Sequence, residues 1–153
     1  MEDRGHTVGG VYCPEIRRGG RRVGFKIVDL TEGEEYPLAE VGAPGPRVGR
    51  YGVYVENLER AADSIERAVE EADLVIVDEV GPMELKSDRF IEAVETAADA
   101  DTPALFVVHE RSRHPLVVDL RERRDDVKRY RVTPENRDRL PDRITRLILS
   151  WLE

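Results

Sequence analysis

The stretch from Ala72 to Leu85, ADLVIVDEVGPMEL, constrains the fold more than any other part of the sequence. Its apolar run, Leu74 to Val77, contains no polar residue, and such a run is typical of a strand that is covered on both faces. Strands of this kind belong to parallel sheets that lie between layers of helices. Two carboxylates, Asp78 and Glu79, follow directly at the carboxyl end of the strand. Open parallel sheets bind their ligands at this end, so the stretch predicts a fold class and the place of a site.

The sequence after residue 57 alternates between helical and strand patterns. Apolar residues recur at helical spacing from Asn57, a plausible N-cap, to Ala72, and Ser87 is the expected cap of a second helix. A parallel sheet covered by helices explains this alternation. We therefore expect helices at 57–72, 87–100, 115–123 and 141–153, and strands at 74–77, 104–110 and 127–132.

The residues before this alternation predict an antiparallel meander. Apolar and polar residues alternate along residues 21–30, and turn residues separate this segment from the next strand candidate. The chain of 153 residues has the length of one domain, spanning residues 1–153. The predicted fold class is α/β, with a mainly parallel sheet, flanking helices and a meander of strands at 9–13, 21–30, 36–41 and 50–55.

The composition argues against several classes of function. The net charge of −8 disfavours nonspecific binding to nucleic acid. The sequence contains no apolar run of about 18 residues that would span a membrane and no N-terminal signal core, so we expect a cytoplasmic protein. Cys13 is the single cysteine, which excludes a disulfide within the chain. Scarce amide side chains and 37% charged residues are typical of a thermophile.

The acidic pair has the chemistry of a nucleotide-hydrolysing site. In P-loop NTPases an acidic residue at the end of a buried strand holds the magnesium ion, directly or through water. A second carboxylate polarises the attacking water as a general base. Asp78 is therefore the magnesium candidate and Glu79 the base candidate. The alternative is a strand that simply ends in two solvated acids, although Gly81, Pro82 and Glu84 indicate a shaped loop.

Such an acidic motif requires a phosphate-binding loop as its partner. The pattern of that loop, G-x-x-x-x-G-K-[ST], lets backbone amides surround the phosphates while its lysine contacts them. The segment GPMELKS has Gly81, Lys86 and Ser87 at the right spacing, but Leu85 stands in place of the second glycine. The segment also comes after the acidic strand, which is the wrong place for a phosphate-binding loop. No other stretch of this sequence has the pattern.

Four segments together resemble a known family: VGGVYCPEIRRGGRRVGFKIVDL, RVGRYGVYVENLE, LVIVDEVGPMELKSDRF and VTPENRD. In these segments the chain is similar to the archaeal and bacterial nucleoside-triphosphatases of the THEP type and to their human cancer-related relative. The resemblance implies a P-loop fold and slow, magnesium-dependent hydrolysis of several nucleoside triphosphates, ATP and GTP among them. It implies Glu79 as the catalytic residue and Asp78 as the metal ligand. The nucleotide-binding residues that it implies are Leu74, Val75, Ile76, Val77, Asp78, Glu79, Val80, Gly81, Asn136 and Arg137.

Two of these residues have a second interpretation. Asn136 and Arg137 lie in the segment ENRD, which precedes the last expected helix. There they also fit the roles of a helix cap and a surface charge.

The chain departs from the family in its N-terminal part. The family begins with a strand, the P-loop and a helix, roughly 25–30 residues that have no counterpart in this sequence. Losing that strand is expected to remove the phosphate cradle and to leave an apolar slot between neighbouring strands. Three explanations stay open: a misassigned start, an inactive truncated remnant, or a short nucleotide-binding or interaction domain. A nucleotide or nucleoside kinase is a further alternative, and the sequence leaves the oligomeric state open.

Overall fold

The protein is seen in a computed structural model that describes residues 4–153. One eight-stranded sheet runs in the order β5-β6-β4-β3-β1-β7-β8, and β2 pairs with β3. The strands are β1 (Val8–Tyr12), β2 (Glu15–Arg18), β3 (Arg21–Asp29), β4 (Glu34–Val41), β5 (Arg47–Val48), β6 (Tyr51–Val53), β7 (Leu74–Val80) and β8 (Ala104–Val108). The helices are α1 (Val55–Glu71), α2 (Asp88–Asp99), α3 (Pro115–Val118) and α4 (Leu140–Leu152), with helical turns at η2 (Glu84–Lys86) and η3 (Asp119–Arg123).

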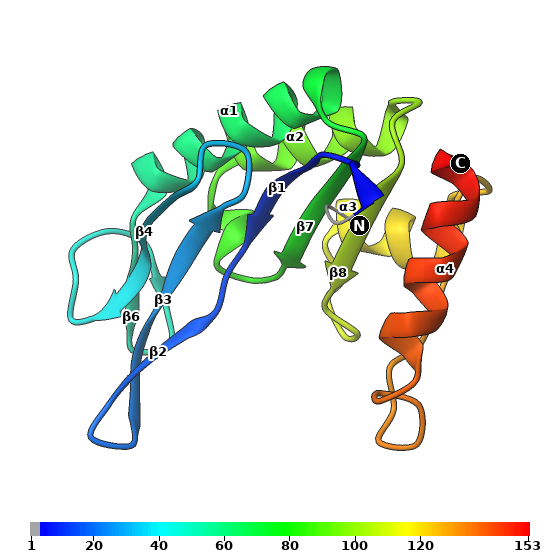
Figure 1. Ribbon diagram of the computed structural model, residues 1–153. Coiled ribbons are helices and arrows are strands. Elements are labelled where there is room, and N and C mark those ends of the chain that lie inside the picture. Colours follow the sequence, from blue (N-terminus) through cyan, green and yellow to red (C-terminus); the bar gives the residue numbers. More distant parts are fainter. Residues whose placement is uncertain (1–3) are drawn as a thin grey trace.

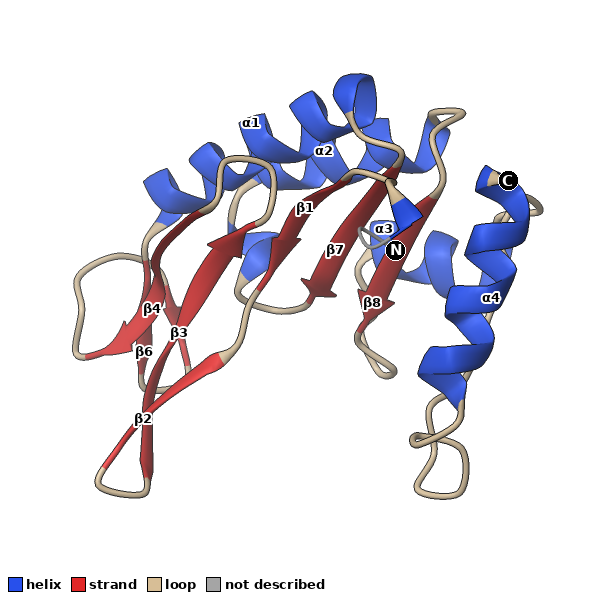
Figure 2. Cartoon of the chain, viewed as in Figure 1, coloured by secondary structure: helices blue, strands red, loops and turns tan. Residues whose placement is uncertain are grey.

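Helices α1 and α2 lie side by side along one face of the sheet (Figure 1). Helix α4 stands at the β8 end of the sheet, where the coloured elements of Figure 2 show no strand beyond β8. The predicted α/β class, with a parallel part, flanking helices and an antiparallel meander, is confirmed. Among the described residues, no helix combines the length and the apolar character that a membrane crossing requires.

The hydrophobic core fills the space between the sheet and helices α1 and α2. Alanines recur on the inner side of α1, and their small side chains let this helix approach the sheet closely. The larger fully buried side chains belong to strands and helices alike: Val11, Ile27, Leu38, Leu58, Ile65, Val75, Val77, Phe90 and Val94.

The two helices that form the core start differently from one another. Ser87 caps α2 as predicted, because its hydroxyl oxygen accepts a hydrogen bond from the backbone N–H of Phe90 at 3.1 Å. The predicted N-cap of α1 is wrong, since that helix begins at Val55 and Tyr54 occupies the cap position. Asn57 lies inside the first turn, and its side-chain amide donates to the carbonyl oxygen of Pro37 at 2.7 Å. This bond ties the helix to β4.

The parallel part of the sheet consists of β1, β7 and β8. In the β1–β7 pairing, Gly10 lies opposite Ile76 and Tyr12 lies opposite Asp78. Strand β7 is the central strand of the three, which is why its apolar run is unbroken. The run is buried at three of its four positions, and Ile76 is half-buried. Strand β7 thus brings the acidic pair to the carboxyl end of the parallel strands.

The predicted strand at residues 127–132 is wrong. This segment has no regular secondary structure, and the apolar side chain of Val132 is 68% exposed. A strand needs a neighbour whose backbone N–H and C=O groups complete its ladder. Strand β8 ends the described sheet, and it pairs with β7 alone among the described strands. The alternating sequence pattern of residues 127–132 is therefore not sufficient for a strand, because no described strand lies beside this segment to complete its backbone hydrogen bonds.

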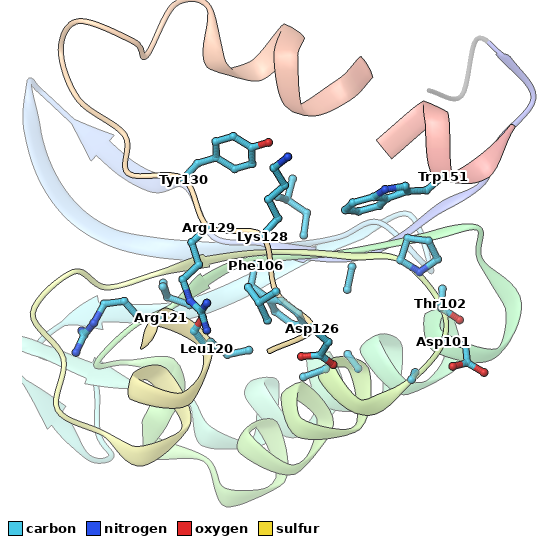
Figure 3. A pocket seen from close by; sticks show the side chains of 18 residues that line it. Asp101, Thr102, Phe106, Leu120, Arg121, Asp126, Lys128, Arg129, Tyr130 and Trp151 are labelled. Carbon is cyan, nitrogen blue, oxygen red and sulfur yellow. The ribbon is translucent and has the colours of Figure 1, made fainter. Parts of the chain in front are cut away.

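Cavities lie on two sides of β8. One, of about 630 Å³, separates Phe106 from Tyr130 and Trp151, and Figure 3 shows these rings around it. The second, of about 790 Å³, is lined by apolar side chains of β7, β8 and α4, including Val107, which is 42% exposed. The expected apolar slot between neighbouring strands is not found in the described sheet, because β1 pairs with β7 and β7 pairs with β8 directly. The larger cavity lies instead between α4 and the side chains of β1, β7 and β8.

The predicted helix at residues 115–123 is present in two parts. Helix α3 (Pro115–Val118) continues into the wider turn η3, and the ring nitrogen of His114 accepts a hydrogen bond from the backbone N–H of Leu116. Proline at the first helical position lacks an N–H that would be unpaired there, which favours the start at Pro115.

Candidate active site

The acidic pair lies at an irregularity of β7. Asp78 pairs with Tyr12 of β1 and with Val107 of β8, but the next paired residue of β7 is Val80, opposite Val108. Glu79 is thus an extra residue in the β7–β8 ladder, and such bulges re-aim side chains and are frequent beside active sites. Asp78 is half-buried and Glu79 is exposed. The bulge therefore leaves two adjacent carboxylates accessible at the end of a buried strand.

The environment of Asp78 suits a cation. Burial raises the pKa of its carboxyl group above the ordinary value. Among the described residues, neither Asp78 nor Glu79 forms an ion pair with Lys, Arg or His. A half-buried carboxylate without a protein cation gains stability from a bound ion.

The donor set also fits magnesium better than a metal that needs a protein cage. No group of three or more His, Cys, Asp or Glu residues able to hold a metal occurs within residues 4–153. Magnesium is commonly held by one or two carboxylates, with water and substrate phosphates completing its shell. Asp78 is the residue that would supply the protein ligand.

A third carboxylate, which the sequence reasoning did not assign to the site, lies under the acidic pair. Glu84 in η2 is only 3% exposed, and its Oε1 accepts a hydrogen bond from the backbone N–H of Gly81 at 3.1 Å. Burial, assisted by the charge of Glu79, raises the pKa of Glu84 to about 7. The sequence signal was weak: an acid between Met83 and Leu85, three residues after a glycine.

This raised pKa predicts how stability depends on pH. The folded state binds the Glu84 proton more tightly than the unfolded state, whose pKa is near 4.5. Its stabilising contribution is therefore complete below about pH 4.5 and is lost as the pH rises through about 7. Relative to Glu84→Gln, the wild type is expected to lose about 3 kcal/mol of unfolding free energy across this window. Urea unfolding of both proteins between pH 4.5 and 8 measures it, and a constant difference would contradict the prediction.

Gly81 lies between the two glutamates. A Cβ atom at this position would come within 2.8 Å of Oε1 of Glu79 and 3.2 Å of Oε1 of Glu84. Such contacts leave no room for a side chain unless a carboxylate moves. Gly81 therefore permits both carboxylates to approach the same stretch of backbone.

The other predicted residues of the acidic segment are not at the surface. Leu74, Val75, Val77 and Val80 are buried, and Ile76 is half-buried. Their side chains form the core side of β7 or line the cavity beside α4. Within the predicted segment, Asp78 and Glu79 are the side chains that reach the carboxyl end of the sheet.

Asn136 and Arg137 lie in the turn before α4. The side-chain oxygen of Asn136 accepts from the backbone N–H of Thr133 at 2.7 Å, and its amide donates to the carbonyl oxygen of Arg131 at 2.8 Å. Arg137 is exposed and borders the cavity between β8 and α4. This turn lies at the same end of the molecule as the carboxyl ends of β7 and β8 (Figure 1). Asn136 shapes the turn, and its binding role remains a prediction.

The segment GPMELKS does not form a phosphate-binding loop. Glu84–Lys86 forms the helical turn η2, and Ser87 is engaged as the cap of α2. The backbone N–H of Ser87 donates to the carbonyl oxygen of Glu84. The expectation that this segment only mimics the motif is confirmed.

Comparisons with known proteins show the family of the chain. Residues 1–145 match the model of the NTPase family. The chain is 72% identical to the nucleoside-triphosphatase THEP1 of Methanopyrus kandleri over 153 residues, covering all of this chain and 85% of that protein. It is 47% identical to THEP1 of Archaeoglobus fulgidus over 93% of this chain and 82% of that protein.

Two solved structures share the fold. The crystal structure of THEP1 from the hyperthermophile Aquifex aeolicus matches with a TM-score of 0.83 and 32% identity, over 96% of this chain and 87% of the other. The solution structure of a human cancer-related nucleoside triphosphatase matches with a TM-score of 0.75 and 35% identity, over 95% and 84%. The acidic pair at the end of a parallel strand, the family match and these relatives agree, and the chain belongs to the NTPase family.

Proposed function

We propose that the chain hydrolyses nucleoside triphosphates to nucleoside diphosphate and phosphate, slowly and with a broad range of nucleotides. The observation that supports this most is the accessible pair Asp78 and Glu79 at the carboxyl end of the central parallel strand. The 72% identity to a nucleoside-triphosphatase over the whole chain supports the same reaction.

In the proposed mechanism the two carboxylates have separate roles. Asp78, whose carboxyl pKa is raised by burial, is the residue that would hold magnesium, directly or through water. The ion would supply positive charge against the negative charge of the β- and γ-phosphates. Glu79 accepts a hydrogen bond from the attacking water and takes its proton as the water attacks the γ-phosphorus in line. The exposed position of Glu79 leaves its carboxylate within reach of water.

The proposal also needs a group that holds the phosphates. No stretch of the sequence has the phosphate-binding pattern, whereas the Methanopyrus kandleri protein extends beyond the part that this chain matches. The direct test compares phosphate release by this chain with release by a fused chain that carries the unmatched part of that relative. ATP, GTP, CTP and UTP are each assayed with magnesium and with excess EDTA.

The outcomes separate the candidate functions. Magnesium-dependent phosphate release by either chain supports the proposal. Nucleotide binding without release by both chains would instead favour a binding module, the function that the missing loop pattern suggests. Transfer of phosphate to an added nucleoside or nucleotide acceptor, rather than its release, would favour a kinase.

The metal role of Asp78 gives a separate prediction. Asp78→Asn removes the charge but keeps the size of the side chain, so the magnesium concentration for half-maximal activity is expected to rise about tenfold. Titration of the activity with MgCl₂ in the active chain measures this shift. Asp73→Asn is the matched control, because Asp73 precedes β7 at the opposite end and bonds to Thr7. An equal effect of both variants would contradict the assignment.

A further inference from the structure

The buried carboxylate of Glu84 is directed at the backbone that follows the catalytic candidate. Its Oε1 accepts the N–H of Gly81 at 3.1 Å, and Gly81 is separated from Glu79 by Val80 alone. Leu85 donates its backbone N–H to the carbonyl oxygen of Gly81 at 3.1 Å. Gly81 is thus held through both its N–H and its C=O by the turn η2.

Cys13 connects this turn to the neighbouring strand. Cys13 follows the last residue of β1 and lies near Glu84 and the backbone of Glu79, since both contribute to the shift of its pKa. Burial raises the pKa of the Cys13 thiol, and the Glu84 charge raises it further. The end of β1, the turn η2 and the backbone of Glu79 therefore meet at one buried polar cluster.

A purely local role in stabilising the turn does not explain the arrangement. A turn needs no carboxyl group that is only 3% exposed, because burial of a polar group is unfavourable unless it is hydrogen-bonded. The donor that the structure gives the Glu84 carboxyl group is the backbone N–H of Gly81, in the segment that follows Glu79. The close approach of Oε1 of Glu79 and Oε1 of Glu84 to Gly81 links the two carboxylates through one residue.

We propose that Glu84 is a positioning residue: through the Gly81 N–H it fixes the backbone from Glu79 to Gly81 and so orients the Glu79 carboxylate toward the attacking water. Glu84 does not touch the substrate in this arrangement. The inference rests on the proposed role of Glu79 as the base, and it adds a residue that the acidic motif does not contain.

Three variants test the inference. Glu84→Met has a similar volume but no strong acceptor, so it fills the buried site while releasing the Gly81 N–H. Glu84→Gln keeps an acceptor oxygen and is the rescue variant. Ser87→Ala is the matched control, because Ser87 is 2% exposed in the same segment but bonds to the start of α2.

The first readout is amide hydrogen exchange at Gly81, measured by NMR on this chain without nucleotide. Exchange is expected to be at least tenfold faster in Glu84→Met than in the wild type, while Glu84→Gln and Ser87→Ala stay within about threefold. The second readout is kcat in whichever chain releases phosphate. It is expected to fall about 10- to 100-fold in Glu84→Met with KM within twofold, and Glu84→Gln restores most of it.

The outcomes distinguish this inference from the proposed function. Unchanged Gly81 exchange in Glu84→Met would overturn it, as would an equal loss of kcat in Ser87→Ala. Normal kcat in Glu84→Met, with Glu79→Gln inactive, would overturn the positioning role and leave the hydrolysis intact. Normal turnover in Glu79→Gln would instead remove the base on which the inference rests.

Discussion

Replacing Glu79 with glutamine is expected to lower kcat about 10²- to 10⁴-fold while nucleotide affinity stays within about threefold. Glutamine has nearly the same shape but does not accept the proton of the attacking water. Glu79 is exposed and forms no ion pair among the described residues, so the substitution leaves the fold unchanged. Phosphate release gives kcat, and fluorescence titration with a labelled nucleotide gives the affinity.

The matched control for this prediction is Glu59→Gln on helix α1. Glu59 is also exposed, and the same exchange of carboxylate for amide changes the net charge equally. A normal kcat in this control excludes an effect of net charge on the activity. Unchanged turnover in Glu79→Gln would remove Glu79 from the mechanism, whereas a loss of affinity with normal kcat would assign it to binding.

The acidic end of β7 was predictable because its signal is local. An unbroken apolar run of four residues requires a strand that lies inside the sheet, and the pair Asp78 and Glu79 follows it without a gap. The structure places Asp78 beside β1 and β8, as a central parallel strand requires. What the run did not show is the bulge at Glu79, because the register depends on the neighbouring strand.

The failure at residues 127–132 has the opposite cause. The alternating pattern of VKRYRV favours a strand, but a strand exists only where another one completes its hydrogen bonds. Residues 127–130 line a cavity beside β8 instead. Residues 127–132 could form a strand only beside another strand, and that neighbour would have to come from a distant part of the sequence.

The role of Glu84 was not predictable for a similar reason. Its sequence neighbours, Gly81 among them, suggest only a turn, whereas its 3% exposure is a property of the folded chain. Propensity and spacing describe local structure, whereas a raised pKa describes the packing of distant residues around one group. The acidic pair was therefore found from the sequence, and the carboxylate beneath it required the fold.

Replacing Gly10 with alanine is expected to have the largest effect on stability. Gly10 lies in β1 opposite Ile76 of β7, with φ of 105°, a conformation that residues with side chains rarely adopt. A Cβ atom there would lie 1.9 Å from the carbonyl oxygen of Ile76. The backbone of Ile76 cannot rotate away as a side chain can. Strands β1 and β7 must therefore separate. We expect a loss of at least about 4 kcal/mol, or no folded protein.

Gly33→Ala is the control that tests positive φ without a clash of the added Cβ. Gly33 has φ of 74°, but nothing lies within 4 Å of the Cβ that alanine would add. This variant is expected to lose about 1–2 kcal/mol from the left-handed conformation alone. Urea unfolding of both variants at one pH gives the two losses. Similar losses would mean that β1 and β7 move apart at little cost, and the pairing of Tyr12 with Asp78 would then not fix the position of the acidic pair.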